Sequence, residues 1–587
     1  MRDRCILLIA CVGILVLLSA CGGGNTPPPT PNPVPTITSI TPASETVGGA
    51  GFSLTVNGTN FLSSSVVNFN GSAKATTFVN STQLTATITA ADIAGIGTPT
   101  VSVTNPAPGG GTSGSLPFAV TPVLVKLSTD TFANALSQHA TEVEPDTFAF
   151  GSTIVTAFQV GRSYVGGAAA IGYATSTDGG TTWTNGLLPD ITTFQGGATF
   201  NCVSDPAVAY DAAHGQWIIS SLALQQDANG NLVADQVFVS RSLDGLSWGN
   251  PIAVNPLTQD QNAFYDKEWI VCDDTSTSPF YGNCYAQWRW DNGPFWSSTS
   301  SDGGLTWQAP LNTTDVVHGG GSQPLVQPNG TVIATLGDRG GTAQVAFMST
   351  DGGASWSATT VISTVADHTE AGNLRSNIVA SAQMDGAGTV YVVWQDCSFR
   401  TNCSSNDIVL STSSDGVTWT PPSRVPIDPL TSTVDHFIPG IAVDRATSGA
   451  TAHLTLTYYY YPVSNCGSSC DLYVGFVSSE DGGQTWTAPI QLAGPMQLDW
   501  LPNTSAGTMV GDYISGSYVN GKPFAVFAVA NANSGSVFDE AMYTTAQPML
   551  SPAGALRFSS AGEKPVPNAK SDHKPRKIPP RRSSRRS

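Results

Sequence analysis

The sequence predicts an all-β protein in which most of the chain folds into repeated small antiparallel sheets. Three observations support this prediction. Charged residues make up only 11% of the 587 residues, under half of the roughly 25% found in typical globular domains. Apolar and polar residues alternate in short runs between Gly and Asn turns, which is typical of strands. One short phrase also recurs along the chain, which indicates a repeat architecture.

Residues 1–21 are expected to be an export signal. A charged start, Met-Arg-Asp-Arg, precedes an apolar run from Cys5 to Leu18 and then Leu18-Ser-Ala-Cys21. The run is shorter than the roughly 20 residues of a membrane span and fits a secretion signal. Leu-Ser-Ala-Cys resembles the lipobox of bacterial lipoproteins, which implies that Cys21 is lipidated and anchors the protein in a membrane. The residue directly after Cys21 is Gly22 and not an acid. By resemblance to known sorting rules, we therefore expect the protein to be anchored in the outer membrane.

Residues 22–34 are Gly- and Pro-rich and read as a tether. The next segment, 35–121, contains alternating strands such as Leu54-Thr-Val-Asn-Gly-Thr-Asn-Phe61 and Thr100-Val-Ser-Val-Thr104. This alternation predicts a small antiparallel sandwich. The pattern resembles the IPT/TIG immunoglobulin-like fold, whose members serve as spacers or binding modules. A spacer is the simpler interpretation.

The repeats occupy residues 122–560. Phrases such as Ser176-Thr-Asp-Gly-Gly-Thr-Thr-Trp183 place their aspartates at steps of 66, 58, 49, 64 and 66 residues. An Asp side chain accepts backbone N–H bonds in tight turns, Gly permits positive φ, and Trp buries a large apolar surface. The six copies are therefore a folding device and are not expected to be catalytic: Asp178, Asp244, Asp302, Asp351, Asp415 and Asp481.

These phrases resemble the Asp box of sialidase-type (BNR) β-propellers. A second phrase, an inner-strand start such as Asp205-Pro-Ala-Val-Ala-Tyr, gives seven units for six boxes. The last unit lacks a clear fourth strand, and residues 123–127 could supply it and close the ring. We therefore expect seven blades, with six as the alternative, because sialidases have six.

The resemblance implies that inner strands start at one mouth of a central channel, opposite the Asp boxes. Residues at these starts should converge there, and they predict an acidic ring. Bonding within neighbouring turns is an equally good explanation of their charge. The candidates are Glu142, Glu144, Asp205, Asp266, Lys267, Glu268, Gln323, Arg375, Asn377, Asp435, His436 and Asp512.

Three functions compete for this site. A binding propeller would hold a glycan, a cation or a surface protein, and runs such as Trp288-Arg-Trp290 and Tyr458–Tyr461 fit it, although they could equally be strand packing. A glycoside hydrolase could use paired carboxylates, and several carboxylates could hold Ca²⁺, although no cofactor is required. The resemblance implies that a true sialidase has three Arg, but the Phe/Tyr-Arg-Ile-Pro motif is absent. Only Arg375 falls naturally on the expected mouth, with Arg162 and Arg289 as less favoured candidates. Whether the protein is an enzyme stays open, and no catalytic residue is assigned.

Charge separates the body from the tail. Residues 22–560 hold 13 Lys/Arg and 39 Asp/Glu, whereas 561–587 hold nine Lys/Arg and two acids. So acidic a body is a poor nucleic-acid binder. The basic, Pro-rich tail is expected to be disordered, either solvated or gripping an anionic polymer.

The cysteines of the mature chain are expected to form disulfides, since the chain is exported. Cys397/Cys403 and Cys466/Cys470 are short-range pairs, and Cys272/Cys284 bracket a loop. The sequence leaves the pairing open, and Cys202 is left over.

Overall fold

The structure, a computed structural model, describes residues 30–197, 199–227, 232–256, 265–290, 294–312, 319–338, 341–549 and 556–566. The lipidation candidate Cys21 and most of the basic tail lie outside these residues. Regular structure in the described part consists of strands and short 3₁₀ turns at Ala90–Ile93, Ala371–Asn373, Thr401–Cys403, Gly449–Thr451 and Leu498–Trp500. None of the helices among these residues is long and apolar enough to cross a membrane. The all-β prediction is confirmed.

The chain divides into two compact units. The smaller comprises the described parts of Met1–Pro42, Phe52–Ile88 and Thr100–Pro117. It has two antiparallel sheets with buried faces, among them Leu54, Val56, Val67 and Val103. One sheet contains β1 (Thr36–Thr41), β3 (Phe52–Thr59), β7 (Gln83–Ile88) and β6 (Thr76–Asn80); the other contains β10 (Leu116–Pro117), β8 (Thr100–Asn105), β4 (Val66–Phe69) and β5 (Ser72–Ala73), with β9 (Gly111–Thr112) on β8.

The larger unit consists mainly of four-stranded antiparallel groups, here called sheets 1 to 7 in chain order. Sheets 1 and 2 are joined into one eight-stranded sheet where Ala168 pairs with Val203. Sheet 1 is β13 (Glu142–Phe150), β14 (Thr153–Arg162), β15 (Ala168–Ser176) and β16 (Thr184–Leu187), and sheet 2 is β17 (Cys202–Asp211), β18 (Gln216–Gln226), β19 (Leu232–Ser242) and β20 (Ile252–Ala253). Sheet 3 is β21 (Tyr265–Cys272), β22 (Cys284–Trp290), β23 (Phe295–Ser300) and β24 (Leu311–Asn312), and sheet 4 is β25 (Gly319–Val326), β26 (Val332–Asp338), β27 (Ala343–Ser349) and β28 (Thr360–Thr364).

Sheet 5 is β29 (Ser381–Met384), β30 (Val390–Asp396), β31 (Asp407–Ser413) and β32 (Ser423–Arg424), and sheet 6 is β33 (Asp435–Val443), β34 (Leu454–Tyr461), β35 (Asp471–Ser479) and β37 (Ile490–Gln497). Sheet 7 is β40 (Ser515–Val519), β41 (Lys522–Ser534), β42 (Val537–Thr545) and β12 (Leu124–Lys126). The strand expected at 123–127 thus completes the last sheet, since Leu124 pairs with Thr545. Short pairs β2 (Ser44–Thr46) with β11 (Ala119–Thr121) and β38 (Asn503–Thr504) with β39 (Gly507–Thr508) also belong to this unit.

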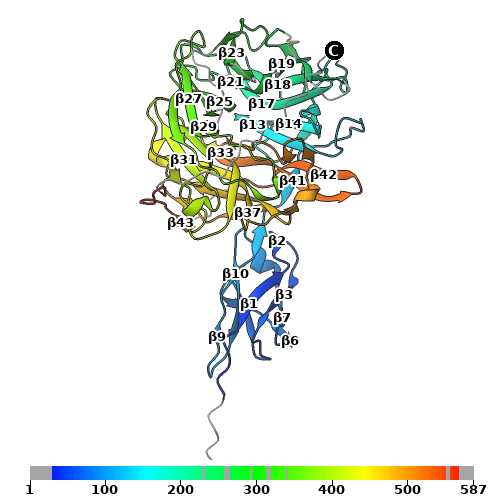
Figure 1. Cartoon of the computed structure of the whole chain (residues 1–587), viewed down its shortest axis with the longest axis vertical. Coiled ribbons are helices and arrows are strands. Elements are labelled where there is room, and N and C mark those ends of the chain that lie inside the picture. The colour runs from blue at the N-terminus through cyan, green and yellow to red at the C-terminus, as the bar shows by residue number, and fades with distance from the viewer. Residues whose placement is uncertain are drawn as a thin grey trace, which may run out of the picture. The chain divides into compact units, whose positions relative to one another are not determined.

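The first strands of the sheets lie toward the middle of the larger unit, and later strands such as β19, β23, β27 and β31 lie toward its rim (Figure 1). Side chains join neighbouring first strands. Asp146 Oδ2 accepts from Val208 N at 2.8 Å, and Gln323 Oε1 accepts from Ala382 N at 2.7 Å. Ser515 Oγ accepts from Thr147 N at 3.2 Å, which joins sheet 7 to sheet 1.

The repeated Asp phrases form local turns after the third strands. Ser176 Oγ donates to Asp178 Oδ1 at 2.8 Å, and this oxygen accepts from Thr182 N at 2.9 Å. The bonds from Ser to Asp and from backbone N–H to Asp recur at the other five turns. A glycine of each turn faces the preceding sheet, and Gly180 faces Phe524 of sheet 7. The phrase is a structural turn, as its chemistry indicated.

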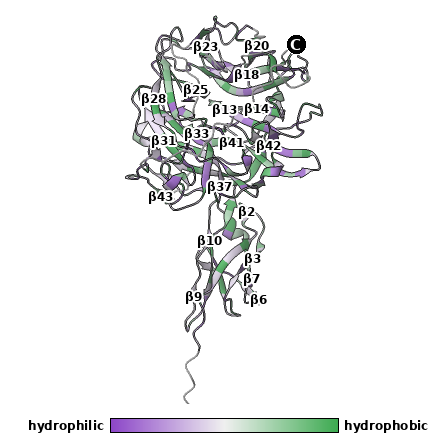
Figure 2. Cartoon of the chain, in the orientation of Figure 1, coloured by the Kyte–Doolittle hydropathy of each residue, from purple (hydrophilic) through white to green (hydrophobic). Residues whose placement is uncertain are grey.

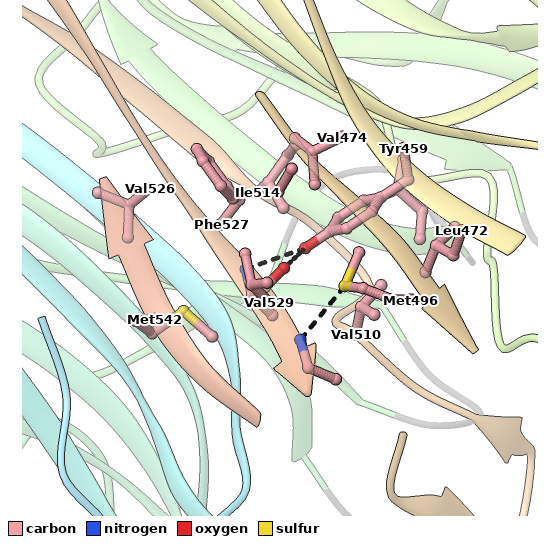
Figure 3. Packing of buried hydrophobic residues seen from close by; sticks show 14 of the residues in the cluster. Tyr459, Leu472, Val474, Met496, Val510, Ile514, Val526, Phe527, Val529 and Met542 are labelled. Atoms are coloured by element: carbon pink, nitrogen blue, oxygen red, sulfur yellow. Dashed lines mark hydrogen bonds between the residues drawn. The ribbon is translucent and has the colours of Figure 1, made fainter. Parts of the chain in front are cut away.

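Many of the apolar residues lie within the strands (Figure 2), and they form the cores between the sheets. The largest described cluster includes Tyr459, Leu472, Phe527 and Met542 (Figure 3). The buried Tyr459 hydroxyl donates to Ala528 O and accepts from Ala528 N, both at 2.9 Å, so its polar end is satisfied inside the core.

Three disulfides join Cys272 to Cys284, Cys397 to Cys403 and Cys466 to Cys470, and Cys202 is a buried free thiol. These are the three pairs favoured by spacing.

The chain after sheet 7 returns across sheets 5 and 6. Strand β43 (Arg557–Phe558) pairs with β36 (Trp486–Thr487), Glu563 pairs with Arg424 at 3.4 Å, and Val566 N donates to Ser398 O at 2.7 Å. The expected boundary at residue 560 therefore falls inside a bonded segment.

Candidate functional site

Five of the seven first strands share a bulge, and in β13, β17 and β21 the side chain at the bulge belongs to a group of charged residues that contact one another. The register shifts between Val143 and Asp146, and equivalent shifts occur in β17, β21, β25 and β33. Each bulge contains a residue with positive φ: Glu144 (57°), Asp205 (48°), Lys267 (52°), Gly321 (59°) and Ile438 (48°). Such a conformation is strained for residues other than glycine, and its recurrence indicates that the surrounding fold imposes it.

Asp512 is the hub where these side chains meet. Its carboxylate accepts from Lys267 Nζ at 2.6 Å and from Asn377 Nδ2 at 3.0 Å. Arg375 binds it through both arms of the guanidinium, with Nε at 2.7 Å from Oδ1 and Nη2 in contact with Oδ2. Such a two-armed pair is among the strongest polar contacts in proteins.

Two further carboxyls complete the network. Lys267 Nζ lies 3.5 Å from Glu144 Oε1 and 3.5 Å from Asp205 Oδ1. On its other side, Glu144 accepts from Gln159, which in turn accepts from Arg162 Nη1 at 2.8 Å. All of these groups are buried or nearly so. The sequence-predicted residues Glu144, Asp205, Arg375 and Asp512 are therefore brought together.

The protonation of the network follows from these contacts. Burial acts to raise the pKa of Asp512, but Arg375 and Lys267 outweigh it and hold the pKa well below its ordinary value. For Glu144, burial dominates and raises the pKa to about 7, although Lys267 opposes it. Two cations therefore face three carboxyls, one of which is readily protonated. The centre is a nearly neutral ion network rather than the acidic ring that we expected.

A small cavity lies beside the network, lined by Asp205, Lys267, Glu268, Trp269 and Tyr513 among others. Its volume of about 20 Å³ is room for roughly one water molecule and too little for a sugar ring. The Lys267 ammonium lies 5.4 Å from the centre of the Tyr513 ring, and Trp269 packs edge-on against the same ring at 5.2 Å. Two aromatic side chains thus line this cavity.

Glu268 does not occupy the position that we assigned to it. The bulge makes Lys267, not Glu268, the equivalent of Glu144 and Asp205. Because side chains alternate along a strand, a slip of one residue turns Glu268 away from the hub. It is fully buried, and burial raises its pKa well above the ordinary value, although Ser220 opposes this. Glu268 is therefore a buried acid that lines the cavity, and burial favours its protonated form.

The remaining candidates lie off the hub. Asp266 forms an ion pair with Arg289. Asp435 Oδ1 accepts from Asn406 N at 2.6 Å, and His436 packs between Tyr458 and Tyr460.

Near His436 lies the only group of three metal-ligating residues that the described part of the chain brings within 4.8 Å, Asp407, Asp428 and His436. Arg400 Nη2 lies 2.5 Å from both carboxylates, and Arg424 lies 2.8 and 2.7 Å from them. This group already has its counterions and is a poor Ca²⁺ site.

The aromatic runs serve mainly as packing. Trp288, Tyr458, Tyr459 and Tyr461 are buried, and only Trp290 and Tyr460 of these runs are half-buried. Sequence reasoning also missed Gln159 and Tyr513, and we find no signal in the residues themselves that would have revealed them.

Comparison with known proteins identifies the small unit. A family model described as the IPT/TIG domain matches residues 35–120, which confirms the module predicted at 35–121. No curated protein matches the chain.

Several solved structures resemble the chain. One is a protein of unknown function from Dyadobacter fermentans (16% identity, 61% of this chain and 99% of that chain, TM-score 0.39). Others are a Hadza microbial sialidase (15% identity, 79% and 76%, TM-score 0.36) and the NanB sialidase from Streptococcus pneumoniae (13% identity, 84% and 88%, TM-score 0.36).

Proposed function

We propose that sheets 1 to 7 form a closed seven-bladed propeller. Three contacts support closure between the first and last sheets. The strand Leu124–Lys126 is contributed to sheet 7 from a position just before sheet 1. The Ser515 hydroxyl bonds Thr147 N, and the Gly180 turn faces Phe524.

We further propose that this propeller binds a partner and does not carry out hydrolysis at its centre. One observation carries the proposal: the convergent carboxyls are bound to cations of the chain itself. A glycosidase needs two carboxyls on either side of an open space, separated by roughly 5 to 9.5 Å. Here Asp512 is held ionised by Arg375 and Lys267, and the adjoining cavity of about 20 Å³ cannot admit a sugar.

The partner we propose is a glycan or a surface protein, bound on the outer part of the mouth. Asp266 and Arg289 are the more accessible charged groups there, with 26% and 18% of their side chains exposed. Half-buried Trp290 and Tyr265 lie beside them, and aromatic rings next to polar groups are typical of binding surfaces. No cofactor is needed for this function, and nucleic acid is an unsuitable partner for so acidic a body.

We also propose that the protein is exported and held at the cell envelope, in the outer membrane, by lipid on Cys21. The three disulfides support an oxidising compartment. The IPT/TIG module would then act as a spacer that carries the propeller away from the membrane.

The test uses the full mature chain on a glycan array and on isolated cell envelopes, with hydrolysis of the bound glycans measured in parallel. We expect binding without turnover, and weaker binding in Asp266→Ala and Arg289→Ala. Glu480→Ala is the matched control, because Glu480 lies in the Asp-phrase turn after β35. Turnover that disappears in Glu144→Gln would refute the binding-only function.

A sialidase-type hydrolase is the second candidate, and one observation favours it. Arg162 and Arg375 are close enough to influence one another, and Tyr513 interacts with Glu144. However, Arg375 already binds the Asp512 carboxylate, where a substrate carboxylate would have to bind. Release of sialic acid that is lost in both Arg375→Lys and Tyr513→Phe would establish this function.

A further inference from the structure

Two buried glutamates lie where the first and last sheets meet. Glu142 begins β13 and Glu540 lies in β42, and each is only 1% exposed. Within the described residues, Glu142 Oε1 and both carboxyl oxygens of Glu540 have no hydrogen-bond partner. A buried carboxylate without a partner costs several kcal/mol, so this arrangement requires a compensating proton or cation.

Backbone bonds fix the two glutamates beside one another. Glu540 N donates to Ala140 O at 3.1 Å, and Phe538 N donates to His139 O at 3.2 Å. Ser128 Oγ accepts from Met542 N at 2.8 Å. The segment that leads into β13 is thereby joined to β42. We call the segments 139–142 and 538–542 the seam.

The charges that face the seam do not neutralise it. Glu142 interacts with Asp130, Asp539 and the single cation Lys126. Glu540 interacts with Glu142 and with Arg162, whose guanidinium already donates to Gln159 and Gly167. His139 adds charge only when protonated. Among the described residues, no group of three metal ligands is found here, which leaves a proton as the compensating charge.

We propose that Glu142 and Glu540 are protonated while the seam is closed, and that their ionisation at alkaline pH opens the seam between the first and last sheets. The inference depends on the contacts of β13 with β42 and not on any ligand of the mouth. Burial disfavours the charged form of each acid, and the charge of Glu142 further disfavours ionisation of Glu540. The seam is then the part of the unit that responds first to rising pH.

The direction of the effect follows from the raised pKa values. Burial raises the pKa of Glu142 from 4.5 to about 8, and Asp130 adds to the rise. Burial and Glu142 together raise the pKa of Glu540 well above its ordinary value. A carboxyl with a raised pKa in the closed state stabilises closure below the pKa of the open state, and this stabilisation is lost as pH rises toward 8. Glu142 alone then increases the opening equilibrium by roughly 100-fold between pH 6 and pH 9.

Hydrogen exchange of the full mature chain, followed by mass spectrometry and corrected for intrinsic rates, tests this proposal. In the wild type, seam peptides should lose about 100-fold in protection between pH 6 and pH 9. In the double variant Glu142→Gln/Glu540→Gln this loss should shrink at least tenfold, and Glu142→Gln alone should already reduce it, because neutral amides replace the titrating acids. Glu480→Gln, at a half-exposed surface position, should behave as the wild type.

Two outcomes would overturn the proposal. One is unchanged seam protection across this pH range in the wild type. The other is an equal pH dependence in the wild type and in both seam variants. A gain of protection on adding Ca²⁺ at pH 9 that both seam variants lack would instead identify the compensating charge as a cation.

Discussion

Asp512 offers the sharpest test of the ion network. The change Asp512→Asn preserves size but removes the charge that Lys267 and Arg375 share. Breaking a buried ion pair from one side costs about 3–5 kcal/mol, because the partner charge remains buried. Asn can still accept one bond from Arg375, and Glu144 and Asp205 still face Lys267. We therefore expect the loss of stability to lie at the lower end of this range, about 3 kcal/mol.

The assay is denaturant unfolding followed by tryptophan fluorescence. All 13 tryptophans lie between residues 183 and 500, so the signal reports the larger unit and not the IPT/TIG module. Asp512→Asn should lower the unfolding midpoint with an unchanged slope.

Asp266→Asn is the matched control, since it also removes an Asp charge, next to Lys267 in the sequence, but from a pair that is partly exposed. We expect about 0–1 kcal/mol for it. If Asp512→Asn costs no more than Asp266→Asn, the hub does not stabilise the unit and the argument for a closed centre fails.

Three further predictions concern closure, disulfides and pH. Gly180→Ala should destabilise the larger unit by about 1–3 kcal/mol more than Gly179→Ala. Both glycines have a positive φ, so the backbone strain of the two variants is similar. A Cβ at position 180 would lie 2.2 Å from the ring of Phe524 in β41, whereas a Cβ at position 179 would lie 4.0 Å from Asn520. Equal midpoints for the two variants would contradict contact between sheets 1 and 7. Replacing Cys272 and Cys284 together by Ser should lower the free energy of unfolding by about 3 kcal/mol, because the unfolded chain is no longer constrained by a closed loop. The same unfolding assay measures this loss. An unchanged free energy of unfolding would mean that the two cysteines do not form a disulfide. Burial raises the pKa of Asp146 to about 7, so the contribution of Asp146 to stability falls as pH rises from about 4 to 7. In Asp146→Asn the unfolding midpoint should therefore depend less on pH in this range than it does in the wild type. An equal pH dependence of the two midpoints would contradict the raised pKa.

Most of the fold could be predicted because its signals are local. The turn around Asp178 is bonded within the seven residues 176–182, so its sequence nearly determines its geometry. The pairing of 124–126 with sheet 7 was predictable for a different reason: the last unit lacked a strand and a free apolar segment was present. The inner-strand start of sheet 5 was placed too early, because residues 375–379 lie outside β29 and Arg375 N bonds Thr508 O instead.

The candidate site was harder to predict, since it depends on register across strands that are far apart in sequence. Glu268 and Lys267 are adjacent, and both are charged residues at the start of a strand. Only the bulge decides which one faces Asp512, and a bulge inserts one residue without a distinct composition. In sheets 1, 2 and 6 the positive-φ residue precedes a proline (Glu144-Pro, Asp205-Pro and Ile438-Pro), but in sheet 3 Glu268 follows Lys267, so this signal is missing there. The choice changes the chemistry inferred for the site. A glutamate there would have completed an acidic ring suited to a cation, whereas lysine neutralises its neighbours and closes the centre. The functional question therefore moves from the buried centre to the surface around it.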